Sequence, residues 1–466
     1  MSKKIKTLIV TLGVLILLGG AYYGSTVWKK KKADAASSKT ASPKLGNLES
    51  ANLAKIDVNG LVLEKKGETW ELSSVGGKNP AKGIELDESQ LQRLTWSFAS
   101  IWAERIVDDK PADLSIYGLD KPSSRVTVTD SSGKIVSYIL GSINPSKDGY
   151  YLMEEGDPKV YTVAAYSAES MGITLDKLRK KTLFPAFEFN ELTKLQIENA
   201  GTNIDIKAKP ESVPPYLASS FSTHIMTYPY KLVRGVDRQA LYDLLTPLKD
   251  LVIEEFVDDN PSSLSPYGLD KPARFFFETA KVSVDLLVGN RTGNSRYAKL
   301  AGSPGIFTVS GLDKIIDVKP FTLVDKFALL VQIDSVDKLT VSGGEKILNA
   351  EFQGKGDAAV FSLNGKKAET KSFKTFYQAP VALMIDAEYP HTGAASTANA
   401  KDGSISIEYQ LNTPPGAKVS ITLVPYNRDF YALRQEGTTE FLIARNQVQS
   451  IYEKADEVTY EDSIKP

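Results

Sequence analysis

The sequence predicts an α+β fold, with an N-terminal transmembrane helix followed by three repeated units, each a mainly antiparallel sheet with one longer and one short helix. Three observations predict this class. The stretch VDDKPADLSIYGLDKP at 107–122 recurs as VDDNPSSLSPYGLDKP at 257–272. A strand with alternating apolar and polar residues opens each of three successive segments. An amphipathic helix pattern follows the early strands of each segment, so we expect an array of like units.

The first element is an uncharged stretch at 7–28, inside a segment 1–32 that carries seven lysines and no acid. Its 22 residues would span about 33 Å as a helix, which is enough to cross a hydrocarbon core. We therefore expect 1–32 to be a single-pass membrane anchor with basic flanks. The alternative is a signal peptide cleaved at Ala33-Asp34-Ala35, which the four lysines at 29–32 disfavour.

Two opposing signals bear on the orientation of this anchor. Lysines after the uncharged stretch outnumber those before it, which favours a cytoplasmic body. Basic residues ahead of an apolar stretch also begin export signals, and long domains cross the membrane largely regardless of flanking charge. We expect the bulk of the chain to be extracytoplasmic, at the cell membrane. Residues 33–46 are small, polar and aperiodic, which predicts a flexible linker.

Three repeat units are expected beyond the linker, at 47–190, 191–333 and 334–466. Their opening strands lie at 55–58, 194–197 and 338–341. One amphipathic helix is expected in each unit, with Asp87 and Asp237 as N-caps of the first two and Pro247 and Pro380 as interruptions of the second and third. The apolar stripes of these helices are Leu91, Leu94, Phe98, Ile101 and Trp102; Leu241, Leu244, Leu245 and Leu248; and Phe373, Phe376, Tyr377 and Met384.

Two aromatic strands near the end of each unit support the repeat. An aromatic residue precedes another at the same separation in all three units, as Tyr151 and Tyr161, Tyr297 and Phe307, and Tyr431 and Phe441. Aromatic residues are enriched in strands, so these positions predict sheet packing. Their alternative role is a stacking platform for sugars or nucleic acid.

Composition excludes several classes of function. The net charge is -1, and because 1–32 is basic the rest is mildly acidic, so no nucleic acid is expected as a partner. There is no cysteine, which excludes disulfides and thiolate metal sites. Neither a G-x-x-x-x-G-K-[ST] nor a G-x-G-x-x-G motif occurs, so no nucleotide cofactor is predicted.

The YGLDKP turn is the most specific local feature of the chain, and a structural role is expected for most of it. A glycine suits a backbone with positive φ, a proline can start a strand, an aspartate can close an Asx turn, and the tyrosine can pack beneath. The alternative is a loop that contacts a partner or ligand. The residues concerned are Tyr117, Gly118, Asp120, Pro122, Tyr267, Gly268, Asp270 and Pro272.

Other candidates for chemistry are weaker. Two Asp-Asp pairs, at 108–109 and 258–259, lack further oxygen ligands at loop spacing, so solvated loops are favoured over a metal or acid/base site. The two histidines, His224 and His391, lie in different units and neither follows a nucleophile motif. We predict no catalytic, cofactor-binding or metal-binding residue.

One family shares this order of motifs. The stretches 117–122 and 267–272, with Tyr161-Thr162-Val163 and Phe307-Thr308-Val309, resemble the bacterial membrane-anchored domain-of-unknown-function family 4340. The resemblance covers about residues 50–330 and continues more weakly to the C-terminus. It implies an extracytoplasmic auxiliary component of gliding-motility-type ABC transporters, and it carries over no catalytic residue.

The expected function is therefore that of a non-enzymatic, membrane-anchored interaction protein, accessory to an ABC-type transport system. Its partners would be the membrane and the permease or ATPase subunits. An alternative is a module that binds a cell-envelope polymer or small solute in grooves between the units. A third reading, an uncharacterised hydrolase, requires acids or a histidine from different units to converge in one pocket.

Overall fold

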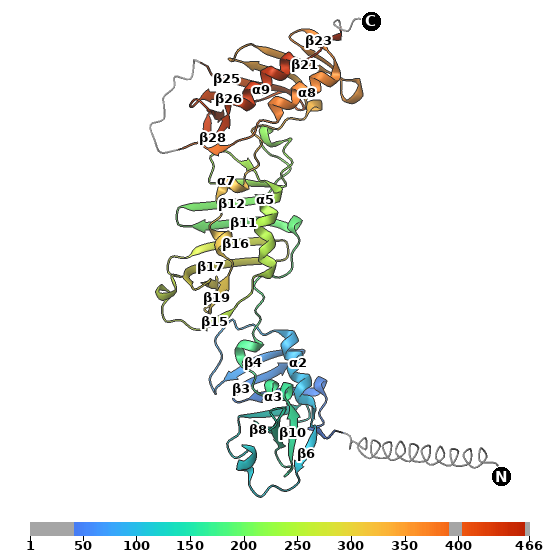
Figure 1. Ribbon diagram of the computed structural model, residues 1–466, viewed down its shortest axis with the longest axis vertical. Helices are drawn as coiled ribbons and strands as arrows, with labels where there is room; N and C mark the ends of the chain where they lie inside the picture. Colours follow the sequence, from blue (N-terminus) through green and yellow to red (C-terminus); the bar gives the residue numbers. More distant parts are fainter. Residues whose placement is uncertain (1–41, 391–402, 462–466) are drawn as a thin grey trace, which may run out of the picture. The chain divides into compact units, whose positions relative to one another are not determined.

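The described residues, 42–390 and 403–461, form four antiparallel sheets in a computed structural model of the chain (Figure 1). The chain divides into an N-terminal body, 1–180, and a C-terminal body, 181–466. The expected anchor and most of the linker lie outside the described residues. Among those that are described, no helix is both long and apolar enough to cross a membrane.

The predicted α+β class is wrong, because sheets dominate the fold. Within the described ranges the longest helices have 12 residues, and most are a single turn or two. They are α2 (Glu88–Ala99), α3 (Ala165–Met171), α4 (Leu175–Leu178), α5 (Arg238–Leu245), α6 (Asp313–Ile316), α7 (Pro320–Leu323), α8 (Thr370–Val381) and α9 (Arg445–Asp456). The fold is therefore mainly β, with short helices packed on the sheets.

Short 3₁₀ turns join several of these elements. They are η1 (Ser50–Asn52), η2 (Leu114–Tyr117), η3 (Phe189–Glu191), η4 (Pro215–Leu217), η5 (Thr246–Asp250), η6 (Ser265–Tyr267), η7 (Ile333–Ser335) and η8 (Gly356–Ala358).

The N-terminal body contains one eight-stranded sheet and a two-stranded one. The larger sheet has the order β4 (Thr69–Val75), β3 (Leu61–Lys66), β2 (Leu53–Val58), β7 (Ser124–Asp130), β8 (Ile135–Ile143), β9 (Gly149–Glu154), β10 (Val160–Ala164) and β6 (Arg105–Asp108). The smaller sheet pairs β1 (Lys44–Leu45) with β5 (Ile101–Trp102).

The C-terminal body contains two nine-stranded sheets. The first has the order β14 (Arg234–Gly235), β13 (His224–Tyr228), β12 (Thr202–Ala208), β11 (Leu192–Asn199), β16 (Ala273–Thr279), β17 (Ser283–Thr292), β18 (Ser295–Leu300), β19 (Ile306–Ser310) and β15 (Glu255–Asp258). The second has the order β23 (Lys366–Ala368), β22 (Val360–Leu363), β21 (Leu348–Gln353), β20 (Val336–Ser342), β25 (Ile405–Asn412), β26 (Pro415–Pro425), β27 (Phe430–Gln435), β28 (Thr438–Ala444) and β24 (Ala387–Glu388).

The three large sheets share one topology. In each, successive hairpin strands lead to a helix, and a short strand then lies at the far edge of the sheet. The four strands that follow form a meander whose last member pairs with that edge strand, as β10 pairs with β6 and β19 with β15. The edge strand was not anticipated from the sequence. Because the edge strand pairs with the last strand of the meander, the loop that follows the edge strand is held against the meander.

The helix boundaries follow from local capping. The carboxylate of Asp87 accepts hydrogen bonds from the backbone amides of Ser89 and Gln90, and Asp237 accepts one from Ala240, so both predicted N-caps are confirmed. Helix α2 ends at Ala99, so the predicted stripe member Trp102 lies instead in β5 and is exposed. Met384 likewise lies beyond α8 and is 44% exposed.

The helices cover one face of each sheet, where the apolar residues gather. Strand β25 shows the alternation, since Ile405, Ile407, Tyr409 and Leu411 are buried while the residues between them are half exposed. Helices α8 and α9 lie side by side on this third sheet (Figure 1). The opposite face carries the repeated loops considered next, with small separate apolar clusters on the first and third sheets.

Candidate functional site

The repeated loop after the edge strand is built around two glycines that backbone geometry requires. Gly118 and Gly268 have φ of +66° and +68°, in the left-handed region that glycine tolerates best. The predicted positive φ is therefore confirmed at both. Gly141, on the neighbouring β8, lies so close to the loop that a Cβ there would be 2.2 Å from the Tyr117 carbonyl oxygen. Gly289 has the same relation to Tyr267, at 2.1 Å.

The loop tyrosines pack beneath the turn and bond back to the edge strand. Tyr117 Oη donates to Asp108 Oδ2 at 3.0 Å, and its ring meets Tyr151 edge-on at 5.0 Å between centroids. The second copy repeats the ring contact, between Tyr267 and Tyr297, at 5.1 Å. The hydrogen bond from Tyr117 to the Asp108 carboxylate raises the pKa of that phenol. The aromatic strands therefore act here in packing.

The aspartates of the turn do not have the predicted role. Asp120 and Asp270 are exposed, and within the described residues their side chains accept no hydrogen bond that would close an Asx turn. That role falls to Asp108, whose Oδ1 accepts from the Lys110 amide at 3.0 Å, and to Asp113, which accepts from Ser115 at 2.8 Å.

Two adjacent exposed residues of the loop are the same in both copies, although packing does not require them. Asp120 and Lys121 of the first copy correspond to Asp270 and Lys271 of the second, and all four are exposed. The prolines after them, Pro122 and Pro272, lead into β7 and β16 as predicted. Each loop thus presents the same pair of opposite charges to solvent.

On the third sheet, the face that corresponds to the loop-bearing face of the first two sheets carries different residues. Buried Val424, Ala432 and Leu442 form a small apolar cluster there, against which Tyr389, Tyr426 and Phe430 pack. Tyr389 and Tyr426 meet edge-on at 5.5 Å. The YGLDKP sequence does not occur in this repeat, so the outward charge pair is confined to the first two.

A buried ion pair joins the second and third sheets inside the C-terminal body. Arg234 Nη2 donates to Glu440 Oε2 at 2.8 Å, and its Nη1 donates to Gln435 Oε1 at 2.7 Å. The guanidinium also lies over the Phe441 ring, 4.8 Å from the centroid. Arg234 and Glu440 are 7% and 4% exposed. Because both are buried away from water, the charge of each is compensated mainly by the charge of the other. Sequence reasoning missed this pair entirely.

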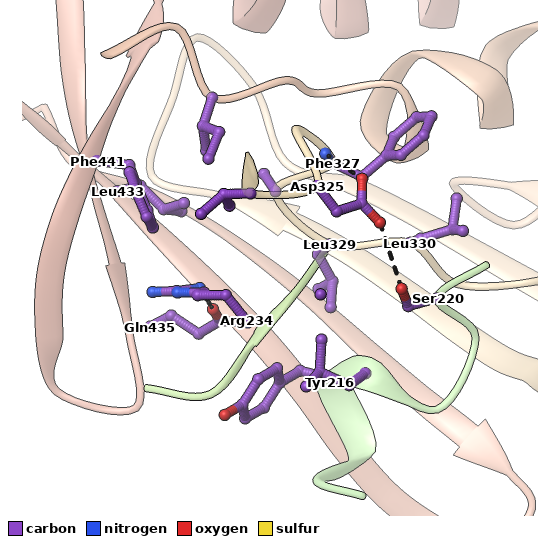
Figure 2. Close-up of a pocket in the computed structure, with 15 residues that line it drawn as sticks. Tyr216, Ser220, Arg234, Asp325, Phe327, Leu329, Leu330, Leu433, Gln435 and Phe441 are labelled. Carbon is purple, nitrogen blue, oxygen red and sulfur yellow. Dashed lines mark hydrogen bonds between the residues drawn. The ribbon is translucent and has the colours of Figure 1, made fainter. Parts of the chain in front are cut away.

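A small cavity of about 30 Å³ lies beside this ion pair. Figure 2 shows Arg234 next to Gln435, with Ser220 directed at Asp325 across the cavity, where the hydroxyl donates to Oδ2 at 3.3 Å. A cavity needs roughly 10–15 Å³ of such space to hold one water molecule. The space therefore suits water, which could serve the buried Arg234 Nε that has no protein partner.

Asp108 and Asp258, the first members of the paired aspartates, end the edge strands β6 and β15, and the described histidine, His224, is buried. His224 is 3% exposed, and its Nε2 lies 3.0 Å from the Leu192 carbonyl oxygen. Burial lowers the pKa of this imidazole, which favours its neutral form. His391 lies outside the described residues. Within the described ranges, no group of three or more potential metal ligands converges.

Comparison with known proteins identifies the family. A model of a family described as a domain of unknown function, DUF4340, matches residues 79–272 and again 226–389. The chain belongs to the DUF4340 family. Two overlapping matches of the DUF4340 model agree with the shared topology of the sheets, and the predicted recognition is confirmed to that extent. No curated protein and no solved structure matches the chain.

Proposed function

We propose that this DUF4340 chain is an extracytoplasmic interaction protein of the cell membrane, an accessory component of an ABC-type transport system that acts through its repeated loops. The observation that carries the proposal is the exposed pair Asp120-Lys121, which recurs as Asp270-Lys271. Neither pair is needed to hold the loop, whose conformation rests on glycines, tyrosines and buried leucines. Contact with a partner gives these exposed side chains a role.

Divergence elsewhere in the same loops supports this argument. Lys110 corresponds to Asn260 and the exposed Ile116 corresponds to Pro266, so outward positions of the loop do change between copies. The Asp-Lys pair is unchanged. A mixed pair of charges suits a polar protein surface of complementary charge, because such rim contacts set orientation and association rate.

The N-terminal sequence supports the location. The uncharged stretch 7–28 is long enough to cross a bilayer, and the short polar linker would keep the sheets close to the membrane. Permease and ATPase subunits of a transporter are accessible from that position only through extracytoplasmic loops of the permease. The permease is therefore the expected direct partner, and the ATPase is expected to be recovered through it.

Affinity capture from detergent-solubilised membranes tests the proposal. The native chain should recover permease and ATPase subunits of one transport system. A double variant, Lys121→Glu with Lys271→Glu, should recover at least about fivefold less, since like charges at an interface cost several kcal/mol. The matched control changes two other exposed lysines, Lys177→Glu with Lys314→Glu, and should leave recovery unchanged.

Two results would contradict the proposal. One is capture that contains no transporter subunit under conditions that preserve known transport complexes. The other is equal loss in the loop variant and the control, which would show that net charge, and not the loops, governs capture. Proteolysis of intact protoplasts tests the location separately: external protease should remove the folded bodies, and full protection would place them in the cytoplasm.

A further inference from the structure

A polar groove crosses the exposed face of the second sheet, opposite its helices. The register places Phe276, Gln196, Asp205 and Tyr228 in one row across four adjacent strands, β16, β11, β12 and β13. Their side chains share the face that points away from the core, because they alternate with buried residues such as Ile197. The groove has a volume of about 200 Å³.

Three polar side chains of the groove, Gln196, Asp205 and Glu198, are held by hydrogen bonds. Gln196 Nε2 donates to Asp205 Oδ2 at 3.3 Å. Glu198 accepts from Arg274 Nη1 at 3.2 Å, and the same guanidinium forms a two-bond pair with Asp285, at 2.8 and 2.9 Å. Such paired groups lose little freedom when a ligand binds. Each carboxylate still has oxygen lone pairs available to accept from a ligand.

An exposed aromatic ring lines the groove beside these groups. Tyr228 is 50% exposed, and within the described residues its hydroxyl has no hydrogen-bond partner. Asn203 also lines the groove, and its side-chain amide makes no hydrogen bond to any described residue. The groove thus offers a flat apolar ring, a free amide and carboxylate oxygens within a small space.

We propose that this groove binds a saccharide chain that carries no acidic groups. A sugar ring has an apolar C–H face that packs on an aromatic ring, and hydroxyls at its edge that donate to carboxylates and amides. Glu198 and Asp205 disfavour an anionic ligand by like-charge repulsion. The volume is below the roughly 300–1,000 Å³ of pockets for drug-sized ligands, so it suits one ring of a longer chain. This site is separate from the repeated loops and goes beyond the proposed contact function.

The other two large sheets show that the topology alone does not create such a groove. In the first sheet the corresponding row contains Thr127, Asp57 and Val62. In the third it contains Thr340 and Asn349 on the strands that match β11 and β12. Neither row has an exposed tyrosine at the end. Tyr151, Tyr297 and Tyr431, for which a stacking platform for sugars or nucleic acid was the alternative to sheet packing, are also not part of the groove.

Titration calorimetry of the purified chain tests the site with three neutral probes, chitotetraose, cellotetraose and maltotetraose, each up to about 10 mM. At least one should bind. Tyr228→Ala should weaken its binding by about tenfold or more, and Asp205→Asn, which keeps the side-chain shape, should weaken it by about threefold or more. Tyr242→Ala is the matched control, since Tyr242 is also 50% exposed in the same repeat but lies on α5, and it should bind as the native chain does.

The contradicting results are equally specific. Absence of binding by all three neutral probes would overturn the proposal, as would equal weakening in Tyr228→Ala and Tyr242→Ala. Tetragalacturonate, an acidic chain of the same length, should bind about tenfold more weakly than the best neutral probe. Equal or tighter binding of this acidic probe would refute the assigned ligand class. None of these outcomes depends on recovery of a transporter.

Discussion

Replacement of Arg234 should destabilise the C-terminal body strongly and leave the N-terminal body unchanged. In Arg234→Ala the buried Glu440 carboxylate loses its 2.8 Å ion pair and keeps the hydrogen bond from the Lys231 amide. Leaving one member of a buried pair uncompensated costs about 3–5 kcal/mol. With a urea slope of about 3 kcal/mol/M, the unfolding midpoint should fall by about 1–1.7 M.

The distribution of tryptophan makes this prediction measurable. The three tryptophans among the described residues, Trp70, Trp96 and Trp102, belong to the N-terminal body, and the fourth, Trp28, precedes them in the sequence. Tryptophan fluorescence therefore follows unfolding of that body alone, whereas far-UV circular dichroism follows both. In Arg234→Ala the urea midpoint of the fluorescence transition should be unchanged. The C-terminal body's unfolding, which only circular dichroism detects, should move to lower urea.

A double variant separates the pair from its surroundings. Arg234→Met with Glu440→Leu removes both charges, and replacing a buried pair by apolar residues is often neutral or stabilising. It should therefore recover most of the stability that the single variant loses. A single-variant loss below about 1 kcal/mol, or a double variant as unstable as the single one, would refute the reasoning, because neither result fits an uncompensated buried charge.

Three further predictions concern local features. Asp87→Ala should lower the stability of the N-terminal body, followed by tryptophan fluorescence, by about 1 kcal/mol, because it removes an N-cap. Asp237→Ala should lower the stability of the C-terminal body, followed by circular dichroism, by a similar amount for the same reason. No change in either variant would contradict the capping geometry. Gly141→Ala should cost about 1–3 kcal/mol because its Cβ would meet the Tyr117 carbonyl, whereas Gly172→Ala, with ordinary contacts, should not; equal effects would contradict the close approach. Burial lowers the pKa of His224 below its usual 6.5, so the neutral imidazole contributes to stability above that pH, and this contribution is lost as the pH falls, by up to about 1.4 kcal/mol per pH unit. His224→Gln should make the free energy of unfolding, followed by circular dichroism, depend less steeply on pH. An unchanged pH dependence would contradict the neutral state of His224.

The strands could be located from sequence because burial of one sheet face is a local property. Alternation places the opening strands inside β2, β11 and β20, and the aromatic positions fall on β9, β18 and β27. The positive φ of the loop glycines, Gly118 and Gly268, could also be predicted from sequence, because a glycine in a repeated turn is typical of that conformation. These inferences needed only neighbouring residues.

The fold class and the ion pair depended on information that sequence spacing does not contain. The first helix pattern reads on through Trp102, but the chain leaves the helix at Ser100 and pairs as β5 with a strand from before the first repeat. Arg234 and Glu440 are 206 positions apart, and nothing in either segment marks the other. The groove at Tyr228 likewise arises from three strands, β11, β12 and β13, whose order is set by the whole sheet.

Site-specific photo-crosslinking in cells tests the central claim most directly. A photoreactive residue is placed singly at Lys121, Lys271, Lys177 or Lys314, all exposed positions of the native chain. The account predicts that the two loop positions, 121 and 271, crosslink to a transporter permease and that 177 and 314 do not. Crosslinks to no protein from either loop, or the same products from all four positions, would contradict a function that acts through the repeated loops.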